Sequence, residues 1–364
     1  MAASRKRRQA KKARAETGTK TRTKTVAVDT GPVTLAEAKA LALAKQPKLA
    51  PRAMRKGAVP PASPAKVGAE RENLENERRE ELARRVREYK ATMAIMKKRG
   101  ARRPRAKRAA EPKGEEPASF VPLQIFAEGD SWFEYPVPFF GGGIIPRLEN
   151  RLGVPILNLA TAGDEVRYML GVEQRKLLTE HLSKGCPAGG PWDVLLFSGG
   201  GNDIVDNPMA LWVKDWDPAV PPAGHIHQPR FDTAVALVRA GYEDLIALRD
   251  ELSPGTQLVF HGYDFAIPDG RGICGYGPWL KPTFDLRKFP MGAARQEVVK
   301  AMLQQFATML ASLATQAKVR FINGQGTLLP NSWHNELHPT KAGFEKFADI
   351  FYRELKKLYP NRVA

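Results

Sequence analysis

Cysteine is nearly absent from this chain of 364 residues, which holds only Cys186 and Cys274. Neither belongs to a CxxC pair, and no cysteine and histidine spacing typical of a zinc site is present. The sequence therefore predicts neither a disulfide framework nor a metal cage, and we expect no metal and no other cofactor.

Long apolar runs are also missing. No stretch approaches the ~18 apolar residues that a membrane-spanning helix needs. The basic N-terminus, residues 1–18, is not followed by the apolar segment of a secretory signal. We therefore expect a cytoplasmic protein with no transmembrane segment.

Acidic and aromatic residues are scarce in the first third of the chain. Residues 1–120 carry 33 Lys and Arg against 13 Asp and Glu, so the overall charge of +18 belongs to this part and the remainder is close to neutral. Residues 1–66 are rich in Lys, Arg, Ala, Pro and Thr. Such a stretch cannot bury enough apolar surface to fold, and we expect a basic, largely disordered N-terminal extension.

A basic extension of this kind binds anionic partners by charge alone, which makes nucleic acid, acidic lipid headgroups or an acidic protein candidate partners. Because aromatic residues are few, specific recognition of single strands by base stacking is not expected. A solubilising or targeting extension without a fixed partner explains the composition equally well.

Residues 68–99 differ from their surroundings because they lack proline and are dense in helix-forming residues. Their apolar positions recur every three or four residues, which predicts a helix with one apolar face. These positions are Leu82, Val86, Tyr89, Met93 and Met96. The pattern lasts only two heptads, so we expect a single docking helix, followed by a charged linker over 100–118. The expected division is an extension, 1–118, and a catalytic domain, 119–364.

From residue 121 onward, short apolar runs alternate with helical patterns. The runs are 123–129, 154–160, 193–199, 256–262 and 318–324, and the helical stretches cover about 144–152, 164–182, 231–251, 292–316 and 340–358. Five apolar strands with intervening helices predict an α/β fold with a parallel sheet covered on both faces. In such a sheet, ligands bind at the carboxyl ends of the strands.

A candidate nucleophile follows the first of these strands, in Gly129-Asp130-Ser131. Gly129 permits a sharp turn, after which the Ser131 hydroxyl faces the crevice and its own N–H can donate to a developing oxyanion. By itself the tripeptide is more often an ordinary turn. Its position at a strand end favours the catalytic interpretation.

Two further strand ends supply candidate oxyanion donors. Gly163 follows the second strand, where a glycine allows a substrate oxygen to approach the backbone N–H closely. Asn202 follows the third strand, in Gly200-Gly201-Asn202-Asp203, and offers a side-chain amide. A phosphate-binding loop is not expected here, since neither GxGxxG nor Gly-Lys-Ser/Thr occurs at any strand end.

His338, which opens the last predicted helix, is the best candidate for a base that takes the Ser131 proton. Pro339 after it suits the first turn of a helix. The other histidines stand in loops, at a helix end or at a strand end, and we expect them to be structural or exposed. They are His181, His225, His227, His261 and His334.

Taken together, these four segments resemble the SGNH hydrolases, also called GDSL-type esterases and lipases, over about residues 121–358. The resemblance implies a three-layer α/β/α fold with a five-stranded, flavodoxin-like sheet. It also implies a metal-independent ester hydrolase with an acyl-enzyme on Ser131, His338 as base, and an oxyanion hole built from Ser131, Gly163 and Asn202. The substrate would be a carboxylic ester such as an acylated sugar or lipid.

The chain departs from the family at the residue that orients the histidine. The family has an aspartate three residues before the histidine, and Asn335 stands there in this chain. Asn335 can orient the imidazole through its amide oxygen, Glu336 can serve as the acid, or a backbone carbonyl can orient the ring of a Ser-His dyad. We favour Asn335.

Two long loops, 204–230 and 263–291, lie at the same predicted end of the sheet. Loops of this length are typical of lids and binding segments. We expect Trp132 and Asp264 to contact substrate, although most aromatic residues of this region fit equally well in a small core beneath the loops.

Two functions are therefore open: an ester hydrolase, or a protein that binds nucleic acid or an anionic surface and carries a weakened hydrolase-like domain. All four family residues are present, which favours the enzyme. We expect a shortened chain that starts near Pro117 to keep its activity, unless the helix at 68–99 packs on the hydrolase domain.

Overall fold

A five-stranded parallel sheet forms the centre of the protein, in a computed structural model that describes residues 31–44, 64–102, 120–135, 142–273 and 275–363. The strands are β1 (Ile125–Gly129), β2 (Ile156–Asn158), β3 (Val194–Ser198), β4 (Gln257–His261) and β5 (Val319–Ile322). Their order is β2-β1-β3-β4-β5, the flavodoxin-like order, with every neighbouring pair parallel. The predicted fold class is confirmed.

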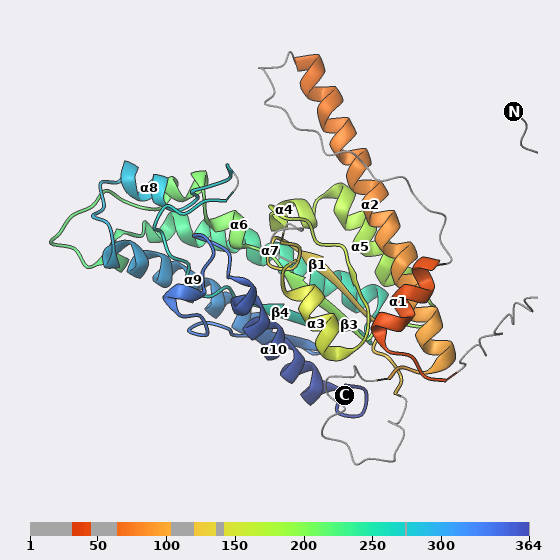
Figure 1. The fold of residues 1–364 in the computed structure, drawn as a ribbon. Coiled ribbons are helices and arrows are strands. Elements are labelled where there is room, and N and C mark those ends of the chain that lie inside the picture. Colours follow the sequence, from red (N-terminus) through yellow and green to blue (C-terminus); the bar gives the residue numbers. More distant parts are fainter. Residues whose placement is uncertain (1–30, 45–63, 103–119, 136–141, 274, 364) are drawn as a thin grey trace, which may run out of the picture. The chain divides into compact units, whose positions relative to one another are not determined.

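Helices cover both faces of this sheet (Figure 1). The long ones are α3 (Ile144–Leu152), α5 (Val172–Lys184), α7 (Gln228–Leu252), α9 (Ala293–Leu313) and α10 (Lys341–Leu358). On one face α3 packs against α10, and on the other α7 packs against both α5 and α9. The central strands β1 and β3 are buried along their whole length, which explains why they read as unbroken apolar runs.

The helix predicted over 164–182 is broken into two. Gly171 separates α4 (Val166–Met169) from α5, and a Cβ at this position would stand 2.8 Å from the carbonyl oxygen of Arg167. The chain therefore turns where the periodic pattern predicted a continuous helix.

Helix α6 (Gly201–Ile204) leads into the first long loop. The two long loops carry the short elements η2 (Asn207–Leu211), η3 (Pro222–His225) and α8 (Lys281–Leu286), and η4 (Pro330–Ser332) lies further along the chain. Aromatic rings fill the space between the loops. The Trp216 ring stacks on His225 at 4.9 Å and contacts Phe289 at the same distance. These aromatic residues form a small core, which the sequence predicted as the alternative to a substrate pocket.

Part of the N-terminal extension is folded. Helix α1 (Leu35–Ala44) lies within the stretch expected to be largely disordered, so that expectation is wrong for these residues. Leu35, Ala38 and Ala42 are buried, and α1 packs against α2. These few apolar side chains cannot build a core by themselves, but they are sufficient for a helix that packs against another helix. Residues 1–30, 45–63 and 103–119 lie outside the described residues.

The expected docking helix is α2 (Pro64–Arg99), and its apolar face lies against the sheet domain. Tyr89, Met93 and Met96 are buried in the same core as the strands, and the Tyr89 ring lies 5.6 Å from that of Trp192. Helix α2 contacts the edge strand β2. A helix along an edge strand covers backbone groups that would otherwise be unpaired.

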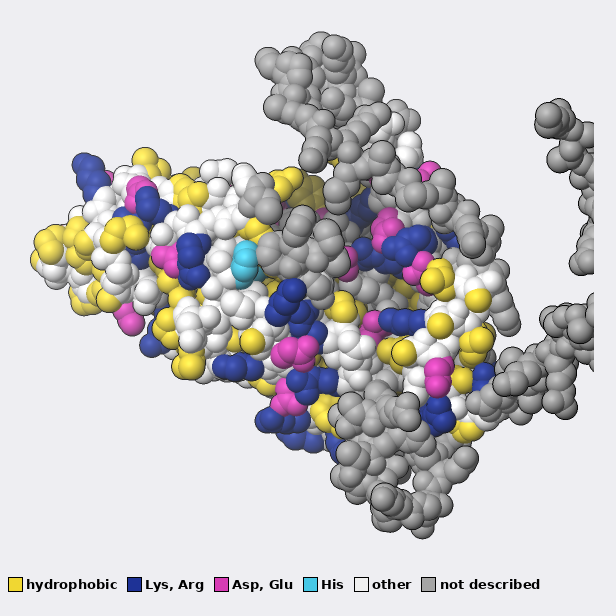
Figure 2. All heavy atoms as spheres, in the orientation of Figure 1, with side chains coloured by type: hydrophobic (Ala, Val, Ile, Leu, Met, Phe, Trp, Pro, Cys, Tyr) yellow, Lys and Arg dark blue, Asp and Glu magenta, His cyan; other side chains and the backbone are white. Residues whose placement is uncertain are grey.

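The surface of the described part carries charges of both signs. On the face seen in Figure 2, basic and acidic side chains lie beside one another, as expected for the near-neutral residues after 120. Of the helices in the described ranges, none combines the length and apolar character that a bilayer crossing demands.

Candidate active site

Ser131 lies in a tight turn at the carboxyl end of β1. The N–H of Asp130 donates to the Ser198 carbonyl oxygen of β3, and the N–H of Phe133 donates back to Asp130. Gly129 permits this approach of the two strands, because a Cβ there would stand 2.6 Å from the Ser198 carbonyl oxygen. The turn therefore holds Ser131 at the sheet end, where it is 8% exposed.

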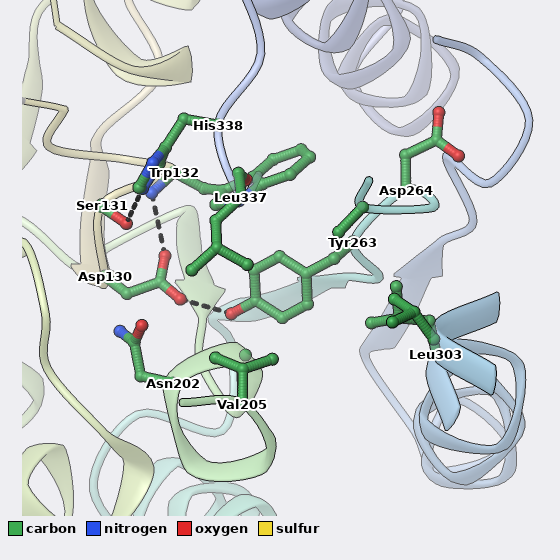
Figure 3. Close-up of a pocket in the computed structure, with 13 residues that line it drawn as sticks. Asp130, Ser131, Trp132, Asn202, Val205, Tyr263, Asp264, Leu303, Leu337 and His338 are labelled. Carbon is green, nitrogen blue, oxygen red and sulfur yellow. Dashed lines mark hydrogen bonds between the residues drawn. The ribbon is translucent and has the colours of Figure 1, made fainter. Parts of the chain in front are cut away.

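The structure brings His338 to Ser131 from the other end of the sequence. Its Nε2 lies 2.7 Å from the Ser131 Oγ (Figure 3). The histidine does not stand in the first turn of the last helix as expected. Thr340 caps α10 through its hydroxyl, and Pro339 instead pairs with Trp333 in an isolated bridge. This bridge folds the segment back and directs the imidazole toward the sheet.

Asn335 orients the imidazole. Its Oδ1 accepts the backbone N–H groups of Leu337 and His338, at 3.0 and 2.8 Å, and lies 3.0 Å from the Nδ1 of the ring. Because those backbone groups can only donate, this atom is the amide oxygen, and the ring nitrogen facing it carries the proton. Nε2 is then free to accept from Ser131.

Burial lowers the pKa of His338 to about 3, and the neighbouring His334 adds to the effect. A carboxylate in place of Asn335 would oppose this shift by stabilising the charged ring. The amide of Asn335 orients the ring in the same way without that charge, so His338 stays neutral over the ordinary pH range and its Nε2 can accept the hydrogen bond of Ser131.

The Glu336 carboxylate points away from the imidazole and binds backbone groups of a loop. It is fully buried and accepts four backbone N–H groups of the 263–291 loop. The donors are Gly270 at 2.9 Å, Trp279 at 2.6 Å, Leu280 at 2.8 Å and Lys281 at 3.0 Å. Glu336 therefore fastens this loop to the segment that carries His338.

The three expected oxyanion donors have different surroundings. Within the described part of the chain, no hydrogen-bond acceptor takes the backbone N–H of Ser131 or of Gly163. Gly163 has φ +88°, a conformation that favours glycine, and it is exposed. One amide hydrogen of Asn202 goes to the Asp164 carbonyl oxygen at 2.9 Å, which leaves the second hydrogen available.

Sequence reasoning missed the role of Asp130. Its buried carboxylate accepts from the Trp132 N–H and the Ser198 hydroxyl, each at 2.9 Å, and from the Tyr263 hydroxyl (Figure 3). Ser198 in turn lies 2.7 Å from His261 Nε2. Burial raises the pKa of Asp130 to about 6 and lowers that of His261 to about 4. The only sequence signal was polar residues at the ends of three apolar strands.

A narrow cavity of about 40 Å³ opens beside Ser131 and His338. Trp132 and Asp264, the expected substrate contacts, both line it. Their polar atoms are already paired: Trp132 Nε1 donates to the Leu337 carbonyl oxygen, and Asp264 accepts backbone N–H groups, among them those of Gly326 and Leu328. Both residues therefore form part of the cavity wall, and neither offers a free polar group to a substrate.

The remaining histidines do not reach this cavity. His261 belongs to the Asp130 network, His225 stacks in the loop core, and neither His181 nor His227 lines the cavity. Among the residues that the structure describes, no group of three or more His, Cys, Asp or Glu side chains is placed to hold a metal ion.

Comparison with known proteins finds no matching family model and no matching curated protein. Similar solved structures include a lipase from a goat rumen metagenome (16% identity, 64% of this chain and 96% of that chain, TM-score 0.42). An extracellular lipase from Streptomyces rimosus is 16% identical over 64% of this chain and 99% of that one, with a TM-score of 0.39. A family 3 carbohydrate esterase from Clostridium thermocellum is 15% identical over 66% and 99%, also at 0.39.

We expect replacement of Asn335 by aspartate to raise the pKa of His338 by about 1–3, because the new carboxylate stabilises the imidazolium. Imidazole nitrogen shifts followed by NMR over a pH titration would measure this. Asn331→Asp, an exposed change on the same segment, is the matched control and should leave the His338 pKa unaltered. Equal His338 titrations in both variants would contradict the proposed orientation of the ring.

Glu336→Gln should destabilise the fold without altering the His338 pKa. A glutamine offers one oxygen to four N–H donors, and each buried donor left unpaired costs about 1–3 kcal/mol. Chemical denaturation measures the loss, and Glu297→Gln, at an exposed site, is the control. A large change in the His338 titration with little loss of stability would instead make Glu336 the acid.

Proposed function

We propose that this protein is a metal-independent serine ester hydrolase that acts through an acyl-enzyme on Ser131. The observation that carries the proposal is the 2.7 Å contact between Ser131 Oγ and His338 Nε2, with Nδ1 held by Asn335. It is the arrangement in which a neutral imidazole accepts the proton of an attacking hydroxyl. The lipases and the carbohydrate esterase named above are of the same class.

In the first half-reaction, Ser131 Oγ attacks the ester carbonyl carbon while its proton passes to His338 Nε2. The carbonyl oxygen becomes an oxyanion, which the N–H groups of Ser131 and Gly163 and the free amide hydrogen of Asn202 stabilise. The intermediate collapses, the bond to the alcohol oxygen breaks, and His338 returns the proton to the leaving alcohol. Each such donor is typically worth ~10²–10³ in rate.

In the second half-reaction, His338 takes a proton from water, and the resulting hydroxide attacks the acyl carbon. The same donors stabilise the second oxyanion, and Ser131 leaves with the proton from His338. The amide of Asn335 keeps the ring in the required orientation in both halves. It stabilises the imidazolium less than an aspartate does, so we expect a slower enzyme than one with a Ser-His-Asp triad.

The cavity beside Ser131 fits a short acyl group. Apolar side chains form much of its wall, among them Val205, Ala266, Val299, Leu303 and Leu337, and Asp130, Tyr263 and Asp264 line it as well. A volume of about 40 Å³ holds roughly three water-sized spheres, since each takes ~10–15 Å³ by this measure. A short acyl group such as acetyl is therefore the proposed substrate group, and the sugar or lipid nature of the alcohol stays a prediction.

A protein that binds nucleic acid or an anionic surface, with a weakened hydrolase-like domain, is the second candidate. Asn335 favours it, because an amide at this position supports catalysis less than a carboxylate. The most basic stretches of the extension lie outside the described residues, so their partner also stays a prediction. Labelling of Ser131 distinguishes the two functions.

A fluorophosphonate probe should label the protein at one site, Ser131, because only an activated serine reacts with it. Intact-protein and peptide mass spectrometry measure the stoichiometry and the position. Ser131→Ala should abolish labelling and ester hydrolysis, whereas Ser332→Ala should leave both unchanged. Undiminished labelling or hydrolysis in Ser131→Ala would refute the proposal.

Leu303→Ala should shift the preferred acyl chain to longer groups, because it opens the wall of the cavity. One methylene in an apolar pocket is worth about 1–3 kcal/mol, or roughly 10–200-fold in kcat/KM. A series of chromogenic esters from acetate to octanoate measures the preference. Leu310→Ala removes a buried leucine of the same helix outside the cavity, and its preference should stay that of the wild type.

A further inference from the structure

Helix α2 reaches the oxyanion side of the site through two arginines. Arg78 and Arg85 stand seven residues apart and therefore on one face of the helix, and both contact the segment that follows β2. That segment, residues 158–166, carries Gly163. Neither arginine lies within residues 121–358, the part whose sequence motifs resemble the SGNH hydrolases.

Arg85 holds the start of this segment. Its Nη1 donates to the carbonyl oxygens of Asn158 and Ala160, both at 3.2 Å. Its Nη2 lies 3.1 Å from the carboxylate of Glu134, which stands in the turn that begins at the nucleophile. The same Glu134 carboxylate accepts from Asn158 Nδ2 at 2.7 Å. One guanidinium thus joins the segment after β2 to the turn after β1.

Arg78 holds the far side of Gly163. Its Nη2 lies 2.7 Å from the carboxylate of Asp164, which also accepts from Gln174. The carbonyl oxygen of Asp164 accepts the side-chain amide of Asn202 at 2.9 Å. Asp164 therefore connects α2 directly to one of the proposed oxyanion donors and is the chain neighbour of another.

Among the described residues, no packing contact holds Gly163 in place directly. It is exposed, and no heavy atom of a described residue lies within 4 Å of the position that a Cβ would take. Its N–H direction therefore depends on how firmly its neighbours on both sides are held. On one side, the Ala160 carbonyl oxygen accepts from Arg85 and the Thr161 N–H donates to the Gly129 carbonyl oxygen of β1. On the other side, the Asp164 carboxylate pairs with Arg78.

The protonation state of the buried Glu128 is consistent with this arrangement. Burial and the nearby Asp164 carboxylate raise the pKa of Glu128 to about 8, so it is mainly protonated at neutral pH. Asp164 then presents the negative charge that pairs with Arg78. Without Arg78, the burial that already raises the pKa of Asp164 would act unopposed by this partner.

We propose that Arg78 and Arg85 of α2 are positioning residues that hold the Gly163 and Asn202 donors toward the oxyanion. This proposal rests on the proposed ester hydrolase function. Oxyanion donors act on the transition state more than on bound substrate, so loss of either arginine should lower kcat and leave KM nearly unchanged. A chain that starts near Pro117 lacks both residues and should turn over slowly, against the expectation from sequence.

The test compares Arg78→Ala with Arg79→Ala in the full chain, using kcat and KM on a chromogenic acetate ester. Arg79 is the adjacent exposed arginine, so both variants lose one positive charge from the same helix. End-point labelling by a fluorophosphonate counts folded sites with a working Ser131, and kcat is expressed per labelled site. Melting temperatures are recorded for both variants.

We expect Arg78→Ala to lower kcat by about tenfold or more, short of the ~10²–10³ that removal of a donor costs. Arg79→Ala should match the wild type. Arg78→Lys should recover most of the loss, because a single donor faces Asp164. Arg85→Lys should not recover the activity that Arg85→Ala loses, because one ammonium cannot bind two carbonyl oxygens and a carboxylate in the geometry of a guanidinium.

A double variant separates positioning from general destabilisation. Arg78→Ala combined with Asn202→Ala should lose less than the product of the single losses, since both act on the same donor. Equal kcat per labelled site in Arg78→Ala and Arg79→Ala would overturn the inference, as would a loss confined to KM. Absence of labelling at Ser131 in the wild type would instead remove the proposed function itself.

Discussion

The buried Asp130 carboxylate is the interaction on which the arrangement of the site depends. It receives the Trp132 N–H from its own turn, the Ser198 hydroxyl from β3 and the Tyr263 hydroxyl from the segment after β4. A buried carboxylate is costly unless its oxygens are paired, so the three strand ends are held together by the same bonds that satisfy it. Ser131 is the next residue, and its place at the sheet end follows from this pairing.

Carboxylates fasten the loops around the site in the same manner. Glu336 gathers four N–H groups of the 263–291 loop, and Asp264 ties the start of that loop to Gly326 and Leu328. Backbone N–H groups that enter a protein interior need acceptors, and a carboxylate supplies several from one side chain. The loop that carries Asp264 and Ala266 is therefore held in place by hydrogen bonds, although it has little regular structure, whereas Val299 and Leu303 of the cavity wall belong to α9.

The N-terminal part of the chain belongs to this framework rather than standing apart from it. Tyr89, Met93 and Met96 of α2 are buried in the common core, and the arginines of the same helix reach the loop after β2. A charge-rich segment can thus have two structural roles. Its apolar face docks on the sheet edge, and two of its arginines bind carbonyl oxygens and the carboxylates of Asp164 and Glu134 instead of an external partner.

From the sequence alone, the five strands and the helix over α2 could be predicted, and Ser131, Gly163, Asn202 and His338 could be selected as candidates, because apolar periodicity and strand-end chemistry are local properties. The different contacts of Asn335 and Glu336 are visible only in the tertiary structure. These neighbours point in different directions, one to the imidazole and one to a loop some 60 residues away along the chain. The same holds for the folding of α1, for the bonds by which Asp130 joins three strand ends, and for the contacts of Arg78 and Arg85 with the segment after β2. Each of these depends on contacts between distant segments, and no periodicity within a segment records which distant group a side chain will meet.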